Sequence, residues 1–121
     1  MSLIKRIRGP IKQLFKPTDR ISFVVAGSQK SGTTALDRYL REHPQICMPK
    51  KKELHYFDRD ENFTPKADYS MYHYYFSPET DQQILGEVTP AYIYWHPAMR
   101  RIWEYNPDMK IIVLLRNPVS R

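Results

Sequence analysis

The sequence predicts an α/β domain built on a central parallel sheet flanked by helices. Residues 21–26 form a continuous apolar, β-branched run, which is typical of a strand buried on both faces of a parallel sheet. Further candidate strands alternate with candidate helices along the chain. The last apolar run, residues 110–115, is followed by only six residues, although a parallel strand normally leads into a crossover helix. The sheet is therefore expected to be incomplete at its C-terminal end.

Composition excludes several classes of protein. The 121 residues suffice for one modest domain, and a hydrophobic content of 41% argues against wholesale disorder. A single cysteine, Cys47, rules out an internal disulfide and fits a reducing compartment. No apolar run approaches the roughly 20 residues of a membrane helix, and the N-terminus lacks the apolar core of a secretory signal. We therefore expect a cytoplasmic protein.

The positive charge is concentrated at the N-terminus. Residues 1–20 contain six lysines or arginines and one aspartate, whereas residues 21–121 are nearly neutral. This distribution argues against nucleic-acid binding. Isoleucines and a leucine recur at helical spacing in the basic segment, but Gly9-Pro10 interrupts them. Packing on the domain is the favoured interpretation of residues 1–20, and weak contact with an anionic membrane surface is the alternative.

The first strand leads into a strand–loop–helix unit. Residues 27–32, called the phosphate loop below, connect the strand to a predicted helix over residues 33–42. His43-Pro44 ends this helix, because a residue before proline avoids helical backbone angles. A short apolar run at 46–48 predicts a second strand. The apolar residues expected on one face of the helix are Leu36, Tyr39 and Leu40.

The second half of the domain repeats this alternation. The aromatic-rich residues 68–76 predict a short helix or lid packed on the domain. Packing of their aromatic side chains in the core is the favoured interpretation, and a platform that stacks on a sugar is the alternative. Residues 84–88 predict a strand, and residues 89–92 either line a cleft or form a turn. Residues 99–105 have helical character and precede the last strand.

The phosphate loop has the composition of an anion-binding site. Gly27 and Gly32 allow a tight turn that brings backbone N–H groups close to an anion, and the helix that follows adds further unpaired N–H groups. Thr33 and Thr34 add hydroxyl donors, and Lys30 lies inside the loop. A nucleoside triphosphate loop places lysine directly after the second glycine. Threonine occupies that position here, so triphosphate hydrolysis is disfavoured.

Four segments, in order, resemble the sulfotransferases of carbohydrate type, such as the heparan sulfate enzymes, which use 3′-phosphoadenosine 5′-phosphosulfate (PAPS). The segments are SQKSGTTAL (28–36), PKKKELHYF (49–57), GEVTPAYIY (86–94) and KIIVLLRNPVSR (110–121). The resemblance implies a P-loop-like nucleotide-binding fold, of which residues 21–121 would be the N-terminal, PAPS-binding portion. It also implies sulfuryl transfer from PAPS to an acceptor hydroxyl or amine, with carbohydrate as the expected acceptor and no metal required.

The resemblance also implies roles for individual residues. Lys30 matches the lysine that contacts the bridging oxygen of the donor, and Glu53 matches the general base. Arg116 matches the arginine on the 3′-phosphate, whereas Ser120 lies at a different offset from the serine that completes that site in the family. The residues that match the cradle of the 5′-phosphate, with its flanking position, are Gln29, Ser31, Gly32, Thr33 and Thr34.

The charge pattern alone gives Glu53 a different interpretation. It follows three lysines, and such a cluster is usually a solvated surface. The apolar residues that follow Glu53 suggest instead that the segment turns back into the domain beside the loop. His55 is the competing base, since histidine can exchange protons near neutral pH. Backbone alternation would place His55 beside Glu53 only if the segment is extended.

Two other functions stay open at this stage. A P-loop kinase or nucleotidase would bind ATP or GTP with Mg²⁺. A truncated, non-catalytic fragment would bind nucleotide without turnover. The sequence itself does not identify the acceptor.

Overall fold

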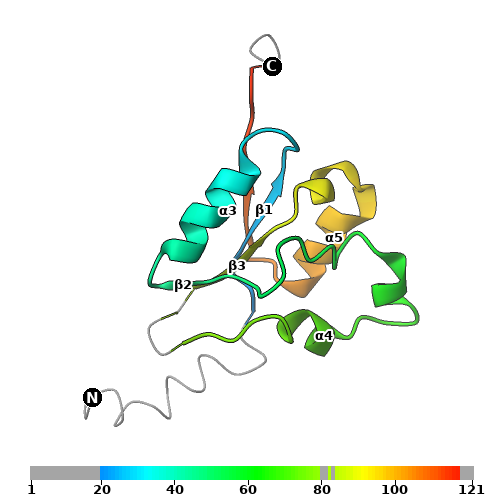
Figure 1. Ribbon diagram of the computed structural model, residues 1–121. Coiled ribbons are helices and arrows are strands. Elements are labelled where there is room, and N and C mark those ends of the chain that lie inside the picture. The colour runs from blue at the N-terminus through cyan, green and yellow to red at the C-terminus, as the bar shows by residue number, and fades with distance from the viewer. Residues whose placement is uncertain (1–19, 80–81, 83, 118–121) are drawn as a thin grey trace, which may run out of the picture.

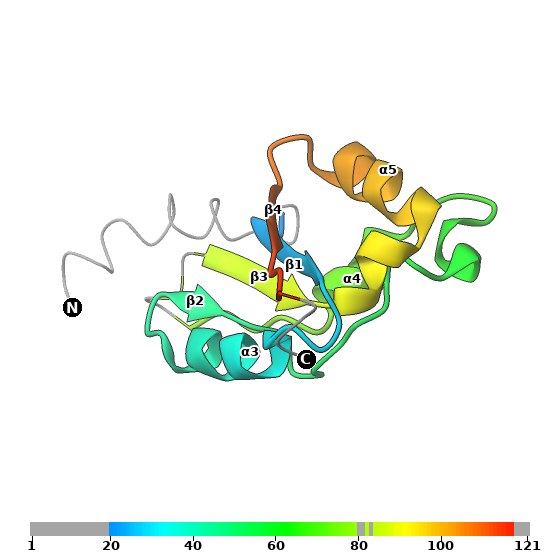
Figure 2. The same cartoon turned by 90° about the horizontal axis from the view of Figure 1, so that it is seen from above.

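The computed structural model describes residues 20–79, 82 and 84–117, and within them it shows a four-stranded parallel sheet. The strands lie in the order β2-β3-β1-β4 (Figures 1 and 2). Their bounds are β1 Phe23–Gly27, β2 Ile46–Cys47, β3 Ile84–Val88 and β4 Lys110–Val113. The predicted α/β class is confirmed, although β4 is shorter than the predicted strand. Ser120 and the basic segment up to residue 19 lie outside the described residues.

Two helices of ten residues cover opposite faces of the sheet, α3 (Thr33–Glu42) and α5 (His96–Tyr105) (Figure 2). The predicted end of α3 before His43 is confirmed, and α5 begins three residues earlier than predicted. The shorter elements are η1 (Asp60–Phe63), α4 (Tyr69–His73) and η2 (Pro90–Tyr94). None of the helices over the described ranges is long and apolar enough to cross a membrane.

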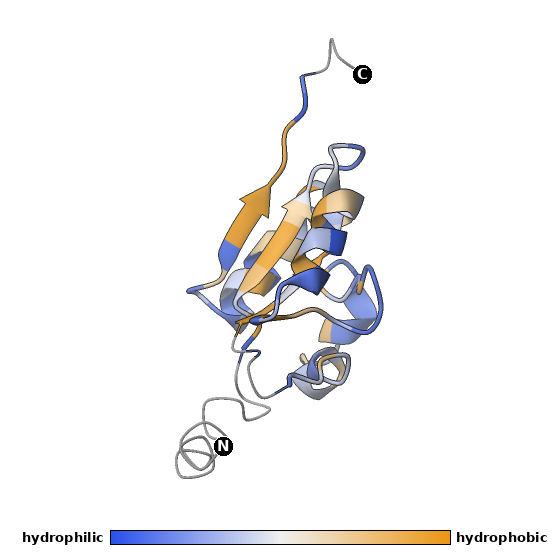
Figure 3. Cartoon of the chain, turned by 60° about the vertical axis from the view of Figure 1, so that its left-hand side comes forward, coloured by the Kyte–Doolittle hydropathy of each residue, from blue (hydrophilic) through white to orange (hydrophobic). Residues whose placement is uncertain are grey.

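Strand β1 is the centre of the fold because both of its faces are buried. Phe23 and Val25 pack with residues of α3 and β2, whereas Val24 and Ala26 pack with α5 and the aromatic side chains. Successive side chains of a strand point to opposite faces, so a fully apolar strand serves two cores at once. The strands are accordingly among the most apolar parts of the chain (Figure 3).

The buried face of α3 differs from the predicted one. Tyr39 is 68% exposed, so its assignment to the apolar face was wrong. Leu36 and Leu40 pack against the sheet, while Asp37 is only 3% exposed. A carboxylate is buried when it has a partner, and Arg41 supplies one from the next turn of the helix.

The aromatic segment is divided between core and surface. Tyr72 is fully buried and stacks on Tyr56, with ring centroids 4.7 Å apart. Phe76 is also buried, whereas Tyr74 is 70% exposed. The predicted core packing is therefore confirmed for the side chains that face the sheet. The resulting aromatic cluster supports the chain segment that follows β2.

Candidate active site

The phosphate loop lies at the edge of the sheet where the parallel strands end. The chain leaves β1 toward α3 on one face and leaves β3 toward α5 on the other (Figure 1). In open α/β sheets this change of direction between neighbouring strands is where ligands bind. The loop is joined to Leu114, the residue directly after β4, by two backbone hydrogen bonds. Leu114 N donates to Gly27 O at 2.9 Å, and Ser28 N donates to Leu114 O at 3.1 Å.

The loop needs both of its glycines for different reasons. A Cβ atom on Gly27 would lie 2.6 Å from Cγ2 of Ile93 in η2, so any side chain there would clash. Gly32 has φ +90° at the N-terminus of α3, in the left-handed region that glycine adopts readily. Lys30 also has positive φ, 62°. A left-handed lysine in a loop is unusual and often marks a functional position.

Arg116 contacts the loop directly. Its Nη1 donates a hydrogen bond to the backbone carbonyl of Lys30 at 3.1 Å. The structure therefore brings Lys30 and Arg116 together, although they lie 86 residues apart in the sequence. Gln29 and Lys30 have exposed side chains, as an anion-binding loop requires.

Glu53, His55 and Asp58 form a connected polar network in the segment that follows β2. His55 Nε2 lies 3.2 Å from Glu53 Oε1, and His55 Nδ1 lies 2.8 Å from Asp58 Oδ2. The two ring nitrogens of His55 therefore each face a carboxylate. His55 has φ 53°, which is a left-handed and not an extended conformation. His55 and Glu53 therefore come together without the extended backbone that was expected from the sequence. Asp58 was missed in the sequence, where its only signal is its position three residues after His55.

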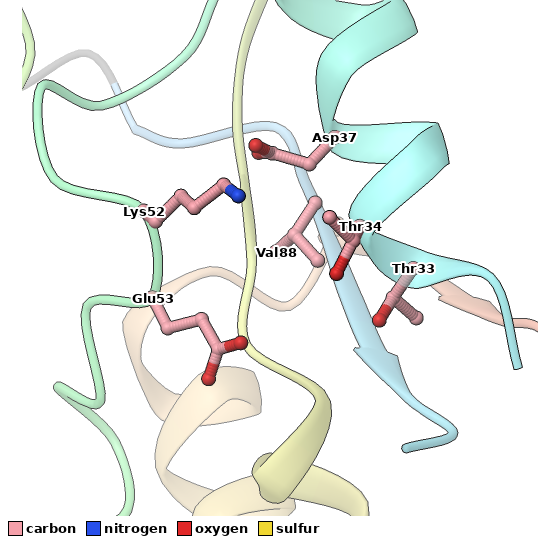
Figure 4. Close-up of a pocket in the computed structure, with 6 residues that line it drawn as sticks. All are labelled: Thr33, Thr34, Asp37, Lys52, Glu53 and Val88. Carbon is pink, nitrogen blue, oxygen red and sulfur yellow. The ribbon is translucent and has the colours of Figure 1, made fainter. Parts of the chain in front are cut away.

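Glu53 faces the first turn of α3 across a small pocket (Figure 4). Its lining residues are Thr33, Thr34, Asp37, Lys52, Glu53 and Val88. The pocket joins the helix that follows the phosphate loop to the segment that carries the candidate base. Glu53 is thus close to the N-terminal end of α3 and is not an isolated surface charge, although its side chain is 47% exposed. Lys30 is not among the residues that line this pocket.

The buried carboxylate of Glu87 holds the chain segment that carries Glu53 in place. Glu87 in β3 is fully buried and accepts hydrogen bonds from three hydroxyl groups. Thr89 Oγ1 donates at 2.6 Å, the hydroxyl of Tyr92 donates at 2.9 Å, and the hydroxyl of Tyr72 also donates. The hydroxyl of Tyr92 in turn accepts from the backbone N–H of Tyr56 at 3.0 Å. This network fixes the chain three residues after Glu53.

The same contacts explain the pattern GEVTPAYIY. Residues 89–92 were expected to line a cleft or to form a turn, and the structure shows a turn whose Thr89 and Tyr92 are fully buried. Their hydroxyls are committed to Glu87. The motif therefore positions other residues of the site.

Burial of Glu87 predicts a pH-dependent stability. Desolvation raises the pKa of Glu87 above its ordinary value of 4.5, although hydrogen bonds from Thr89, Tyr72 and Tyr92 act in the opposite direction. The folded chain then holds the Glu87 proton more tightly than the unfolded chain, so this contribution is full below pH 4.5 and is lost as pH rises through the folded pKa. Glu87→Gln lacks this titration.

The melting temperature of the native chain relative to Glu87→Gln is therefore expected to be highest near pH 4.5 and to fall toward neutral pH. Thermal unfolding of both proteins across this range measures the difference. A difference that stays constant, or that grows as the pH rises, would contradict the raised pKa.

The chain is similar to proteins of a known family. The pattern of the sulfotransferase domain matches residues 20–121. The chain belongs to the sulfotransferase domain family. Among curated relatives, this sulfotransferase domain is 40% identical over 102 residues to the membrane-associated sulfotransferase kil1 of Dictyostelium discoideum. It is 38% identical over 98 residues to human heparan sulfate glucosamine 3-O-sulfotransferase 6.

These relatives are considerably longer than this chain. The alignments cover 83% and 81% of this chain, but only 21% and 27% of the two relatives. A sulfotransferase of Alicyclobacillus acidocaldarius has a similar crystal structure, with a TM-score of 0.68 and 34% identity. That match covers 84% of this chain and 46% of the bacterial one. The P-loop-like fold inferred from the resemblance is thereby confirmed.

Proposed function

We propose that the protein transfers a sulfuryl group from PAPS to a hydroxyl or amine of an acceptor, expected to be a carbohydrate. One observation carries this proposal: Glu53, paired with His55 and Asp58, faces the helix end that follows the phosphate loop across a single pocket. A base that faces the first turn of the helix directly after an anion-binding loop is an arrangement that suits in-line group transfer.

The loop would bind the 5′-phosphate end of the donor. Its backbone N–H groups, the N-terminus of α3 and the hydroxyls of Thr33 and Thr34 all favour an anion. Lys30 would contact the oxygen between phosphorus and sulfur. Its ammonium would stabilise the negative charge that develops on the leaving phosphate. Arg116, which contacts the loop through Lys30, is the candidate ligand of the 3′-phosphate, and Ser120 is proposed alongside it.

Glu53 would accept the proton of the attacking acceptor group. The acceptor oxygen or nitrogen forms a bond to sulfur as the bond between sulfur and the phosphate oxygen breaks, and the electron pair stays on that phosphate oxygen. His55 touches Glu53 and is held by Asp58, so it orients the carboxylate and can share its proton. His55 stays the second candidate for the base itself.

The expected acceptor class comes from the relatives. Several of them are named as heparan sulfate glucosamine 3-O-sulfotransferases, at 33% to 38% identity. Their names describe sulfation of a glucosamine sugar. A hydroxyl of a saccharide is therefore the first acceptor to test for this protein.

Nucleotide binding distinguishes this function from a kinase or nucleotidase. We expect the protein to bind 3′-phosphoadenosine 5′-phosphate (PAP) equally well in EDTA and in Mg²⁺, and to bind ATP more weakly. Isothermal titration of each nucleotide under both conditions measures this. Binding of ATP that depends on Mg²⁺, together with weak binding of PAP, would favour a kinase. Tight PAP binding without transfer to any saccharide would indicate a non-catalytic binding protein.

A further inference from the structure

The segment that carries Glu53 is attached to α3 by one side chain. Arg41 Nη1 donates to the backbone carbonyl of Pro49, and Nη2 lies 3.5 Å from the carbonyl of Lys51. Its Nε donates to Asp37 Oδ2 at 2.9 Å. A guanidinium group presents several donors in a fixed plane, which suits simultaneous contact with a carboxylate and two carbonyls. Arg41 therefore joins the helix after the phosphate loop to residues 49–53.

The partner of Arg41 is buried in the same pocket as Glu53. Asp37 is 3% exposed, and its Oδ1 atom is buried without a hydrogen-bond partner in the part of the chain that the structure describes. Figure 4 shows its carboxylate and the Lys52 ammonium pointing toward one another across the pocket. A buried carboxylate oxygen attracts a cation. Asp37 thus acts on the segment through Arg41.

The segment is also anchored on its other side. The backbone N–H of Lys50 donates to the carbonyl of Tyr75 at 2.9 Å, next to the fully buried Pro49. Residues 49–51 are therefore held between α3 and the aromatic segment. The last anchored carbonyl, that of Lys51, lies only two residues before Glu53. If the carbonyl of Lys51 moves, Glu53 is expected to move with it, because the intervening chain is too short to compensate.

We propose that the Asp37–Arg41 pair is a positioning device for the transfer step. It sets the distance of Glu53 from the first turn of α3, where the donor is proposed to bind. The inference rests on the proposed function, because Arg41 acts through Glu53 and does not touch the reacting groups. Misplacement of a catalytic group by about 1 Å can lower a rate about 10²-fold. The pair is therefore expected to affect kcat and to leave donor binding intact.

Arg41→Lys is the direct test. Lysine keeps the charge and the spacing for an ion pair with Asp37, but its ammonium cannot contact the carboxylate and both carbonyls together. We expect kcat for transfer to fall about 10- to 100-fold, with the KM for PAPS and the affinity for PAP unchanged. Arg38→Lys on the exposed face of the same helix is the matched control and should behave like the native protein.

Two further measurements separate positioning from general destabilisation. In a Glu53→Gln background, Arg41→Lys should cause no further loss of kcat, because its effect passes through Glu53. Hydrogen exchange at the amides of residues 50–53 should be faster in Arg41→Lys than in the Arg38→Lys control. The inference is overturned by unchanged kcat, by an equal loss of PAP affinity, by a full additional loss in the Glu53→Gln background, or by unchanged exchange. If the native protein transfers no sulfuryl group, the proposed function fails, and the exchange measurement alone then decides whether Arg41 holds the segment.

Discussion

Glu53→Gln is expected to lower kcat for sulfuryl transfer by about 10²–10⁴, the usual contribution of a placed general base. Glutamine has the same shape but cannot accept the proton of the acceptor. Glu53 is 47% exposed, so the substitution should leave the fold intact. The affinity for PAP, measured by titration, should therefore stay that of the native protein while steady-state transfer is lost.

A matched control and a competing variant sharpen this prediction. Glu61→Gln changes an exposed carboxylate in η1 and should have no effect on transfer. His55→Gln should lower kcat less than Glu53→Gln, because it removes only the partner that orients the carboxylate. A greater loss in His55→Gln would make histidine the base. Equal loss of transfer and of PAP binding in Glu53→Gln would give Glu53 a structural role.

Lys30→Ala is expected to lower kcat by about 10²–10³, the usual effect of losing one donor that stabilises transition-state charge. The exposed Lys30 side chain projects from the loop, and the carbonyl that accepts from Arg116 belongs to the backbone. The loop contact is thus kept in the variant. Single-turnover transfer from PAPS measures the change in rate.

The control for Lys30 is another exposed lysine. Lys66→Ala removes the same charge away from the phosphate loop and should leave the rate unchanged. A native rate in Lys30→Ala would remove this lysine from the mechanism. A large rise in the KM for PAPS with unchanged kcat would instead limit Lys30 to ground-state binding of the donor.

The central part of the fold could be predicted because local pattern and tertiary structure agree there. The apolar run that ends at the phosphate loop can be buried only between two layers, and β1 is buried in that way. His43-Pro44 can end a helix without help from the rest of the fold, and α3 ends before it. Asp37 could not be predicted as buried, since a carboxylate in a helix normally faces water. Its burial depends on the ion pair with Arg41 and on packing against distant segments.

The candidate site was only partly visible in the sequence. Glu53 was singled out by resemblance, while its charged surroundings indicated a surface residue. Its contact with His55 depends on a left-handed backbone conformation at His55. The segment contains no glycine that would have predicted this conformation. Asp58 is part of the network for the same reason. The burial of Glu87 depends on hydroxyl groups from Tyr72 and Tyr92, which reach it from a different helix and from the turn that follows β3.

The most direct test of sulfuryl transfer is the transfer of labelled sulfate from PAPS to a panel of saccharides by the protein in EDTA. We expect labelled saccharide and released PAP in equal amounts, formed at a rate that does not change when Mg²⁺ is added. We also expect that Glu53→Gln stops this reaction while still binding PAP. Absence of transfer to any acceptor by a folded protein that binds PAP, or transfer that requires Mg²⁺, would contradict the proposed function.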